Sequence, residues 1–263
     1  MKTFFLQIGI IAFLCFVYSS GISAQNESDF EKKIFISGTS DTLRYRLLKP
    51  ISNDTSKKYP IVLFLHGAGE RGNDNSSQLK NGALNFATPL NKKLFPCYVI
   101  APQCAEGFRW VEVDWKLPSH VQPQTPSVYL NRTKLLLDSL LKVLNIDTNR
   151  IYITGLSMGG FGAWDAISRW PEKFAAAVPV CGGGDTAKAE LIKNIPIWAF
   201  HGGADKVVMT SRSRDMIEAI KKAGGNPKYT EYPKTGHNAW TSTYGNIEIF
   251  QWLFSQSLLN RKK

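Results

Sequence analysis

Apolar residues are arranged along the chain in two ways, as short continuous runs and as longer segments with helical spacing. The runs at 61–65 and 98–101 are almost wholly apolar, which is typical of strands buried on both faces of a sheet. Strands are predicted at 34–36, 43–48, 61–65, 98–101, 151–154, 175–180, 195–200 and 228–232, and helices at 128–144, 159–170, 211–223 and 247–259. This alternation without a linker predicts one α/β domain, with a mostly parallel central sheet flanked by helices.

The first two predicted strands flank a short turn. The Gly-Thr-Ser-Asp sequence at 38–41 separates the strand at 34–36 from the strand at 43–48, which predicts an antiparallel pair. We therefore expect residues 25–56 to form an N-terminal β-segment joined to the sheet, and residues 57–263 to form the main domain.

Residues 1–24 have the layout of a secretory signal peptide. A positive charge at Lys2 precedes an apolar run at 4–18, and small or polar residues follow up to Ala24. One alternative is a membrane anchor, although the run is shorter than the about 20 residues that span a bilayer. Another is a lipid anchor at Cys15, but Leu14 is larger than the residue that usually precedes such a cysteine. We expect cleavage after Ala24 and a secreted or periplasmic protein, with no stable membrane insertion.

The composition is that of an ordinary globular protein, with 43% hydrophobic and 20% charged residues. It excludes a mainly disordered chain and a multi-pass membrane protein. The formal net charge is +11, of which the predicted signal peptide contributes only Lys2. Because the basic residues occur as scattered pairs without interleaved aromatics, no nucleic-acid partner is expected. We interpret them as a solvated surface; the alternative is attraction to an anionic polysaccharide or lipid surface.

Three cysteines remain after the predicted cleavage: Cys97, Cys104 and Cys181. Export permits a disulfide, and the odd number leaves at least one thiol unless it pairs between chains. No two of them have the spacing of a metal finger. We expect structural cysteines with at most one bridge, and the sequence does not choose the pair.

Chemically reactive side chains follow four of the predicted strands. The segments are His66–Gly72, Gly155–Gly160, His201–Asp205 and Pro233–His237. Because ligands of such sheets bind beyond the carboxyl ends of the strands, we expect these segments to meet at one edge. That edge would gather a serine, an aspartate and a histidine.

The candidate nucleophile is Ser157, within Gly155-Leu156-Ser157-Met158-Gly159. A G-x-S-x-G sequence between a strand and a helix is typical of a nucleophile elbow. The alternative is a glycine-rich turn with an idle serine. Because a serine hydroxyl is a poor nucleophile without a base, the interpretation depends on a histidine partner.

His237 is the candidate base among four histidines. It follows the last predicted strand, in the chain order Ser…Asp…His of a nucleophile-elbow hydrolase. His66 and His201 each precede a glycine at a strand end, where we expect them to shape loops by hydrogen bonding. His120 lies in an irregular stretch without an evident partner.

Two aspartates compete for the acid position between Ser157 and His237. Asp205 is favoured because it closely follows a predicted buried strand, where it would orient His237 and stabilise its imidazolium. Asp185 is the alternative, or else a loop or helix-capping residue. The negatively charged oxygen that develops during attack on a carbonyl would accept hydrogen bonds from the backbone N–H groups of Met158 and Ala68, with Gly69 as the alternative to Ala68.

These segments, with Ala101-Pro102-Gln103-Cys104, resemble the secreted α/β-hydrolase esterases related to feruloyl esterases and polyhydroxyalkanoate depolymerases. The resemblance covers most of the chain from about Lys57. It implies an α/β-hydrolase fold with residues 57–263 as the catalytic domain, a Ser157–Asp205–His237 triad and ester cleavage through an acyl-enzyme. It does not identify the substrate, because members of the family differ in it.

The segment 182–194 is too short for the cap domain that often covers such a site. An open site favours an ester displayed on a polymer. Candidate substrate contacts are Trp110 and Trp115, in the long irregular stretch 105–127, and Trp240; the alternative for the first two is that they cover the edge of the core.

The sequence predicts a serine esterase that acts on acyl groups, such as feruloyl or acetyl, esterified to polysaccharide. A serine peptidase, a lipid or short-chain carboxylesterase, and an inactive carbohydrate-binding homologue are the alternatives. No cofactor or metal is expected, because the chain has no His-Glu-x-x-His sequence, clustered ligand set or phosphate-binding fingerprint.

Overall fold

The computed structural model describes residues 27–38, 41–52, 54 and 56–261 of the 263-residue chain. The predicted signal peptide at 1–24 lies outside the described residues, as do two residues of the predicted turn at 38–41. Within the described ranges, no helix combines the length and the apolar character needed to cross a membrane.

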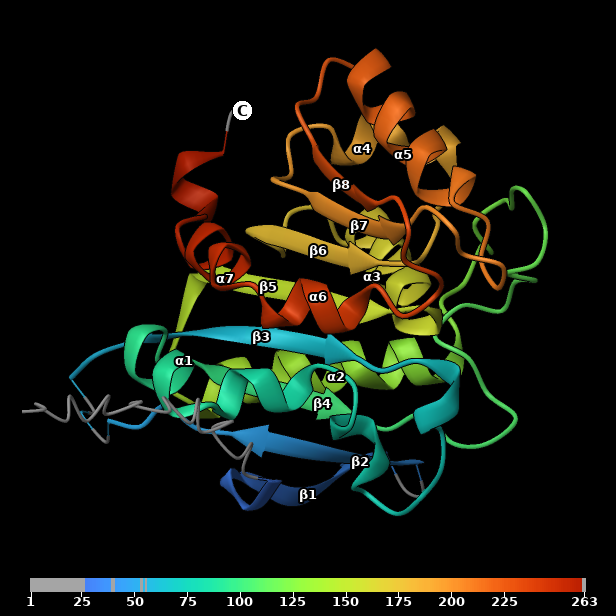
Figure 1. The fold of residues 1–263 in the computed structure, drawn as a ribbon. Coiled ribbons are helices and arrows are strands. Elements are labelled where there is room, and N and C mark those ends of the chain that lie inside the picture. The colour runs from blue at the N-terminus through green and yellow to red at the C-terminus, as the bar shows by residue number, and fades with distance from the viewer. Residues whose placement is uncertain (1–26, 39–40, 53, 55, 262–263) are drawn as a thin grey trace, which may run out of the picture.

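One eight-stranded sheet forms the centre of the molecule (Figure 1). Its order is β1-β2-β4-β3-β5-β6-β7-β8. The strands are β1 (Phe30–Ser37), β2 (Asp41–Leu48), β3 (Tyr59–Leu65), β4 (Tyr98–Pro102), β5 (Ile146–Leu156), β6 (Ala176–Val180), β7 (Trp198–Gly202) and β8 (Lys228–Tyr232). The hairpin of β1 and β2 joins the sheet antiparallel to β4, and the remaining neighbours are parallel. The carboxyl ends of six strands therefore point toward the same edge.

Helices cover both faces of the sheet. They are α1 (Pro89–Leu94), α2 (Val128–Val143), α3 (Met158–Arg169), α4 (Ala189–Ile192), α5 (Ser211–Lys222), α6 (Trp240–Gly245) and α7 (Ile247–Phe254). Side chains of α2, α3, α4 and α5 share one core cluster, and those of α6 and α7 belong to a second. Figure 1 shows α6 and α7 in front of the sheet and α2 and α3 behind it.

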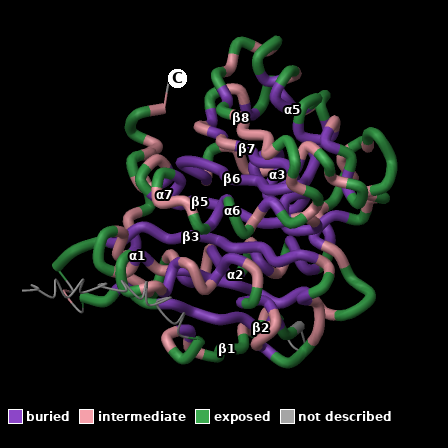
Figure 2. Tube along the Cα trace, in the orientation of Figure 1, coloured by how far each residue is buried: buried purple, intermediate pink, exposed green. Residues whose placement is uncertain are grey.

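The alternation within β3 explains the two cores. Ile61, Leu63 and Leu65 contribute to the cluster under α2 and α3, whereas Val62 and Phe64 contribute to the cluster under α6 and α7. Successive side chains of a strand point to opposite faces, so a strand covered on both faces is apolar at every position. Figure 2 shows the same central strands as buried along their length.

Several predicted elements have different ends in the structure, such as the strand predicted at 151–154, which spans Ile146–Leu156, and two of these differences have a clear physical cause. The strand predicted at 195–200 begins at Trp198, because Pro196 has no N–H to donate and Ile197 forms only an isolated bridge to Ala177. The helix predicted at 247–259 ends at Phe254. There the side-chain amide of Gln256 donates to the Trp252 carbonyl, which a continuing helix would have bonded through the backbone N–H of the same residue.

The three described cysteines are free thiols buried in the protein. Burial raises the pKa of Cys104 and of Cys181 to about 12, and raises that of Cys97 further. They are therefore protonated structural side chains, and none of the three forms a disulfide.

Candidate active site

Ser157 occupies a strained turn between β5 and α3. Its backbone has φ 53° and ψ −117°, in a region that residues other than glycine seldom adopt. The turn is crowded by its neighbours: a Cβ at Gly159 would collide with the backbone of Leu65, and a Cβ at Gly160 with the Val180 carbonyl. The Ser157 N–H donates to the Val180 carbonyl at 2.8 Å. The glycines of the motif thus permit the close approach that presents the serine side chain at the sheet edge.

His237 joins the serine to an aspartate. Its Nε2 lies 2.9 Å from Ser157 Oγ, and its Nδ1 lies 2.7 Å from Asp205 Oδ2. The Nδ1–H donates to the carboxylate, which leaves Nε2 free to accept the serine proton. The His237 side chain is 18% exposed, whereas that of Asp205 is 0% exposed. The serine and the histidine are thus accessible from solvent, and the carboxylate lies beneath them.

Asp205 is held as a carboxylate by four hydrogen-bond donors. Oδ1 accepts from the N–H groups of Val207 and Val208, at 2.8 and 3.0 Å. Oδ2 accepts from His237 and lies 3.2 Å from His201 Nε2. Burial alone would raise the pKa of Asp205, but the hydrogen bonds from His201, His237 and the two backbone groups hold it well below the usual range.

Asp185 has a different position from the one required of a triad acid. It caps the short 3-10 turn Thr186–Lys188, where its Oδ1 accepts from the Ala187 N–H at 3.0 Å. Its Oδ2 accepts from the Gln122 N–H at 2.9 Å. Both oxygens are therefore used in joining loops, in agreement with the capping alternative.

The two predicted oxyanion donors lie at the same edge of the sheet. β3 and β5 pair in parallel with Leu65 opposite Gly155, and Ala68 and Met158 each lie three residues further along the chain from these carboxyl ends. Met158 is the first residue of α3, and Ala68 is the first residue of a 3-10 turn that ends at Glu70. Both N–H groups belong to first turns of helices, where backbone donors lack partners within the helix.

A side chain at the end of the Ala68 turn and others from neighbouring loops brace this turn. Arg71 Nε donates to the Ala68 carbonyl at 2.9 Å, and Asn81 donates to Glu70 Oε1 at 2.6 Å. Gln103 Nε2 donates to the Glu70 carbonyl at 3.3 Å and to Asp74 Oδ1 at 2.7 Å. No role for Gln103 was predicted from the sequence, because its partners are some 30 residues away.

His66 connects this turn to the loop after β4. Its ring is buried, its Nδ1–H donates to the Gly67 carbonyl at 2.6 Å, and its Nε2 accepts from the Cys104 N–H at 2.9 Å. The expectation that His66 shapes a loop is confirmed. Burial lowers its pKa to about 4, which keeps the ring neutral and its Nε2 able to accept.

The His66 pKa predicts how stability depends on pH. Between pH 6.5 and about 4 the unfolded chain binds a proton at this residue that the folded chain does not, so the free energy of unfolding should fall as pH falls. The loss should total about 3 kcal/mol across this window. In denaturant titrations, His66→Asn should be less stable at neutral pH but should show a shallower slope between pH 6.5 and 4. Equal slopes in the two proteins would contradict this assignment.

Trp110 corrects one expectation from the sequence. Its side chain is 0% exposed, and its Nε1 donates to the His66 carbonyl at 2.9 Å. A Cβ at Gly162 of α3 would collide with it at 2.7 Å. The prediction that Trp110 contacts substrate is wrong, because the ring is enclosed in the core.

The other two tryptophans are partly buried. The Arg109 guanidinium lies 4.4 Å above the ring of Trp115, so an arginine covers one face of that ring. Trp240 packs edge-on against the imidazole of His237, with ring centroids 5.2 Å apart. Of the three predicted aromatic contacts, Trp240 is the one that touches a triad residue.

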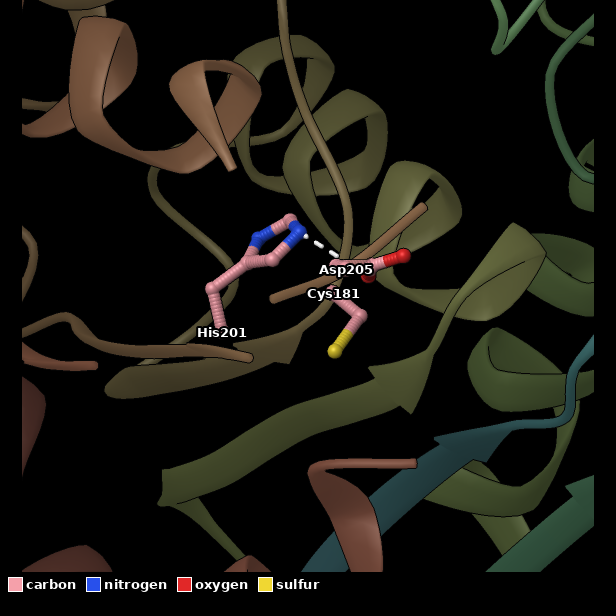
Figure 3. A group of neighbouring side chains, drawn as sticks. All are labelled: Cys181, His201 and Asp205. Carbon is pink, nitrogen blue, oxygen red and sulfur yellow. Dashed lines mark ion pairs between the residues drawn. The ribbon is translucent and has the colours of Figure 1, made fainter. Parts of the chain in front are cut away.

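A cluster of Cys181, His201 and Asp205 has side chains of the kinds that bind metals (Figure 3). One ligand atom from each lies within 4.8 Å of the others. The chemistry does not fit a metal centre, because the atoms already have other partners: Cys181 Sγ donates to the His237 carbonyl at 3.2 Å, and Asp205 Oδ2 accepts from His237 at 2.7 Å. Asp205 is instead a member of the triad, and Cys181 and His201 lie beside it.

The chain is similar in sequence to known proteins. A sequence profile of the phospholipase/carboxylesterase family matches residues 48–251. An uncharacterized secreted protein of Arthroderma benhamiae is 29% identical over 72% of this chain and 22% of its own length. A bifunctional acetylxylan esterase/xylanase of Neocallimastix patriciarum is 30% identical over 42% of this chain and 17% of its own length. The chain therefore spans less than a quarter of either curated relative.

A solved structure extends the likeness to the whole architecture. The crystal structure of a thermostable esterase matches with a TM-score of 0.81 and 43% sequence identity, over 88% of this chain and 64% of that chain. The predicted α/β-hydrolase fold is thereby confirmed, with the eight-stranded, mostly parallel sheet as its core.

Proposed function

Because the chain belongs to the phospholipase/carboxylesterase family, we propose that it is a serine carboxylic ester hydrolase with Ser157 as nucleophile. One observation carries the proposal: Ser157 Oγ lies 2.9 Å from His237 Nε2, and His237 Nδ1 lies 2.7 Å from Asp205 Oδ2. The contacts supply what a serine needs in order to attack a carbonyl at neutral pH.

The reaction proceeds through an acyl-enzyme. His237 Nε2 accepts the Ser157 proton while Oγ bonds to the ester carbonyl carbon, and the carbonyl oxygen becomes an oxyanion. The backbone N–H groups of Met158 and Ala68 stabilise that oxyanion. As the tetrahedral intermediate collapses, the ester C–O bond breaks and the imidazolium gives its proton to the departing alkoxide. Water, deprotonated by His237, then releases the carboxylic acid and restores the serine.

The preferred substrates are feruloyl or acetyl esters borne on a polysaccharide, which suits the openness of the site. Between β6 and β7 the chain forms only a 3-10 turn and the four-residue α4, so no cap domain is inserted there. Phe108 is 43% exposed, and Arg71 of the Ala68 turn lies within 3.5 Å of its carbonyl oxygen. This ring can stack on a phenolic acyl group or a sugar. A polymer substrate also accords with the expected export of the mature chain.

A matched substrate panel tests this proposal. The mature protein is assayed on methyl ferulate, acetylated xylan, p-nitrophenyl esters of increasing chain length and a peptide amide, with Ser157→Ala as the blank. We expect Ser157-dependent release of ferulate or of xylan-bound acetate, with activity falling as the acyl chain lengthens. Preference for long chains or for the amide would replace this substrate class by a lipid ester or a peptide. Failure on every substrate, together with no labelling of Ser157 by a fluorophosphonate, would contradict the hydrolase itself.

A further inference from the structure

A second histidine contacts the triad carboxylate from the strand beneath it. His201 lies on β7, and its side chain is 0% exposed. Its Nε2 is 3.2 Å from Asp205 Oδ2, the same oxygen that accepts from His237 Nδ1 at 2.7 Å. Figure 3 shows the His201 ring directed at the carboxylate. One carboxylate oxygen therefore faces two imidazoles that approach from different strand ends.

The partners of His201 determine which nitrogen carries a proton. Nε2 faces Asp205 Oδ2 and also the Val208 carbonyl at 3.1 Å, and both of these are acceptors. Nδ1 lies 2.8 Å from Ser213 Oγ, which lies 2.9 Å from the Gly182 carbonyl. The Ser213 hydroxyl can donate to either neighbour, but Nε2 must be a donor in both arrangements. His201 thus directs one N–H between the Val208 carbonyl and Asp205 Oδ2, which share it as acceptors.

We propose that His201 is a positioning residue for the hydrolytic reaction, whose Nε2–H holds Asp205 Oδ2 in the orientation that receives the Nδ1–H of His237. The inference rests on the proposed function, because it assigns His201 a part in the work of the same triad. The Val207 and Val208 N–H groups bond only Oδ1 of Asp205, so His201 is the group besides His237 that faces Oδ2, the oxygen that receives the Nδ1–H. His201 makes no contact with a reacting atom.

The elements around His201 explain why it can serve as a fixed support. Its backbone belongs to β7, which is paired with β6 on one side and β8 on the other, whereas Asp205 lies in the loop that follows. Ser213 of α5 holds the far side of the ring and links it to Gly182, just after β6. The other titratable groups around the ring and the carboxylate are Cys181, which interacts with Asp205, and Glu231 of β8. The contact between His201 and Asp205 therefore connects the Asp205 loop to β7, to α5 and to the segment after β6.

Two replacements at His201 separate hydrogen bonding from packing. His201→Gln keeps an amide N–H near the place of Nε2, and His201→Met fills similar volume without a donor. We expect His201→Met to lower kcat by about 10- to 100-fold with KM changed less than about twofold, since a misoriented group of this kind impairs the chemical step. His201→Gln should recover most of that loss. A packing role would give no advantage to glutamine over methionine.

A double-mutant cycle tests whether His201 acts through Asp205. In an Asp205→Asn background, His201→Met should lower kcat by less than about threefold further, because the carboxylate it positions is gone. Equal fold-losses in the two backgrounds would overturn the inference, as would wild-type kcat in folded His201→Met. If His201→Met does not fold by circular dichroism, Ser213→Ala takes its place: a kcat loss that disappears in the Asp205→Asn background supports the inference, and an unchanged kcat overturns it.

The same experiments distinguish this inference from the proposed function. Full activity of Ser157→Ala would contradict the proposed hydrolase mechanism, and it would also contradict a role for His201 in that mechanism. An inactive Ser157→Ala variant, together with additive effects of the His201 and Asp205 substitutions, would support the proposed function and contradict only the positioning role of His201.

Discussion

Replacement of Ser157 by alanine should lower kcat on an activated ester by about a millionfold, since members of such a triad act as a unit. The change removes the Oγ that lies 2.9 Å from His237 Nε2 and leaves the other atoms of the site in place. Alanine has the same Cβ as serine, so the strained turn at φ 53° should be kept and the fold unchanged. The measurement is kcat on p-nitrophenyl acetate, with fluorophosphonate labelling as a count of reactive serines and circular dichroism as a check of folding.

Ser56→Ala is the matched control for this change. Ser56 is exposed and hydrogen-bonds to Asp54 in the loop that leads into the amino end of β3, at the opposite end of that strand from the site. Its replacement should leave kcat and labelling at the wild-type level. A Ser157→Ala protein that is folded and hydrolyses the ester at more than about one hundredth of the wild-type rate would show that the nucleophile is another group.

The second large effect is expected at Asp205. Asp205→Asn should lower kcat by about 10⁴-fold, because an amide that donates to His237 favours the tautomer whose Nε2 carries the proton and cannot accept from serine. The substitution also removes the negative charge that stabilises the imidazolium of His237. Substrate binding should change far less than kcat, since the Asp205 side chain is 0% exposed. Steady-state kinetics on a soluble ester gives both constants.

Asp185→Asn is the companion experiment, because both aspartates lie between the nucleophile and the base in the chain. The asparagine side chain would keep one oxygen for the Ala187 N–H and lose an acceptor for Gln122. We expect a loss of about 1 kcal/mol in the free energy of unfolding and kcat within about threefold of wild type. If the Asp185 change proves the more damaging to kcat, the acid of the triad has been assigned to the wrong residue.

The side chains that meet at the site were predictable because each lies next to a local signal. The glycines around Ser157 mark a tight strand-to-helix turn, and the apolar runs before Ser157 and Asp205 mark buried strands. Parallel strands bring their carboxyl ends to one edge, so residues 80 positions apart, such as Ser157 and His237, could be placed together. The choice of Asp205 over Asp185 followed from the same rule.

Other properties of the site depend on contacts that leave no local pattern. Trp110 occurs in an irregular segment rich in polar residues, yet its ring is enclosed because Gly162 of α3 leaves room for it and the His66 carbonyl accepts its N–H. Gln103 braces the Ala68 turn through partners some 30 residues away. Neither burial nor bracing can be read from spacing, since both depend on the side chains of other elements.

The sequence by itself determined the order of the eight strands and the four longest helices, the strained turn at Ser157 and the identity of the residues at the strand ends, because these follow from local periodicity and glycine placement. The short helices α1, α4 and α6 were not predicted. The tertiary structure alone decided which groups surround the residues at the strand ends. It turned Trp110 inward and placed His201 and His237 on the same oxygen of Asp205. Hydrogen-bond partners and solvent exposure depend on how distant segments pack, and the local pattern of residues along the chain does not predict that packing.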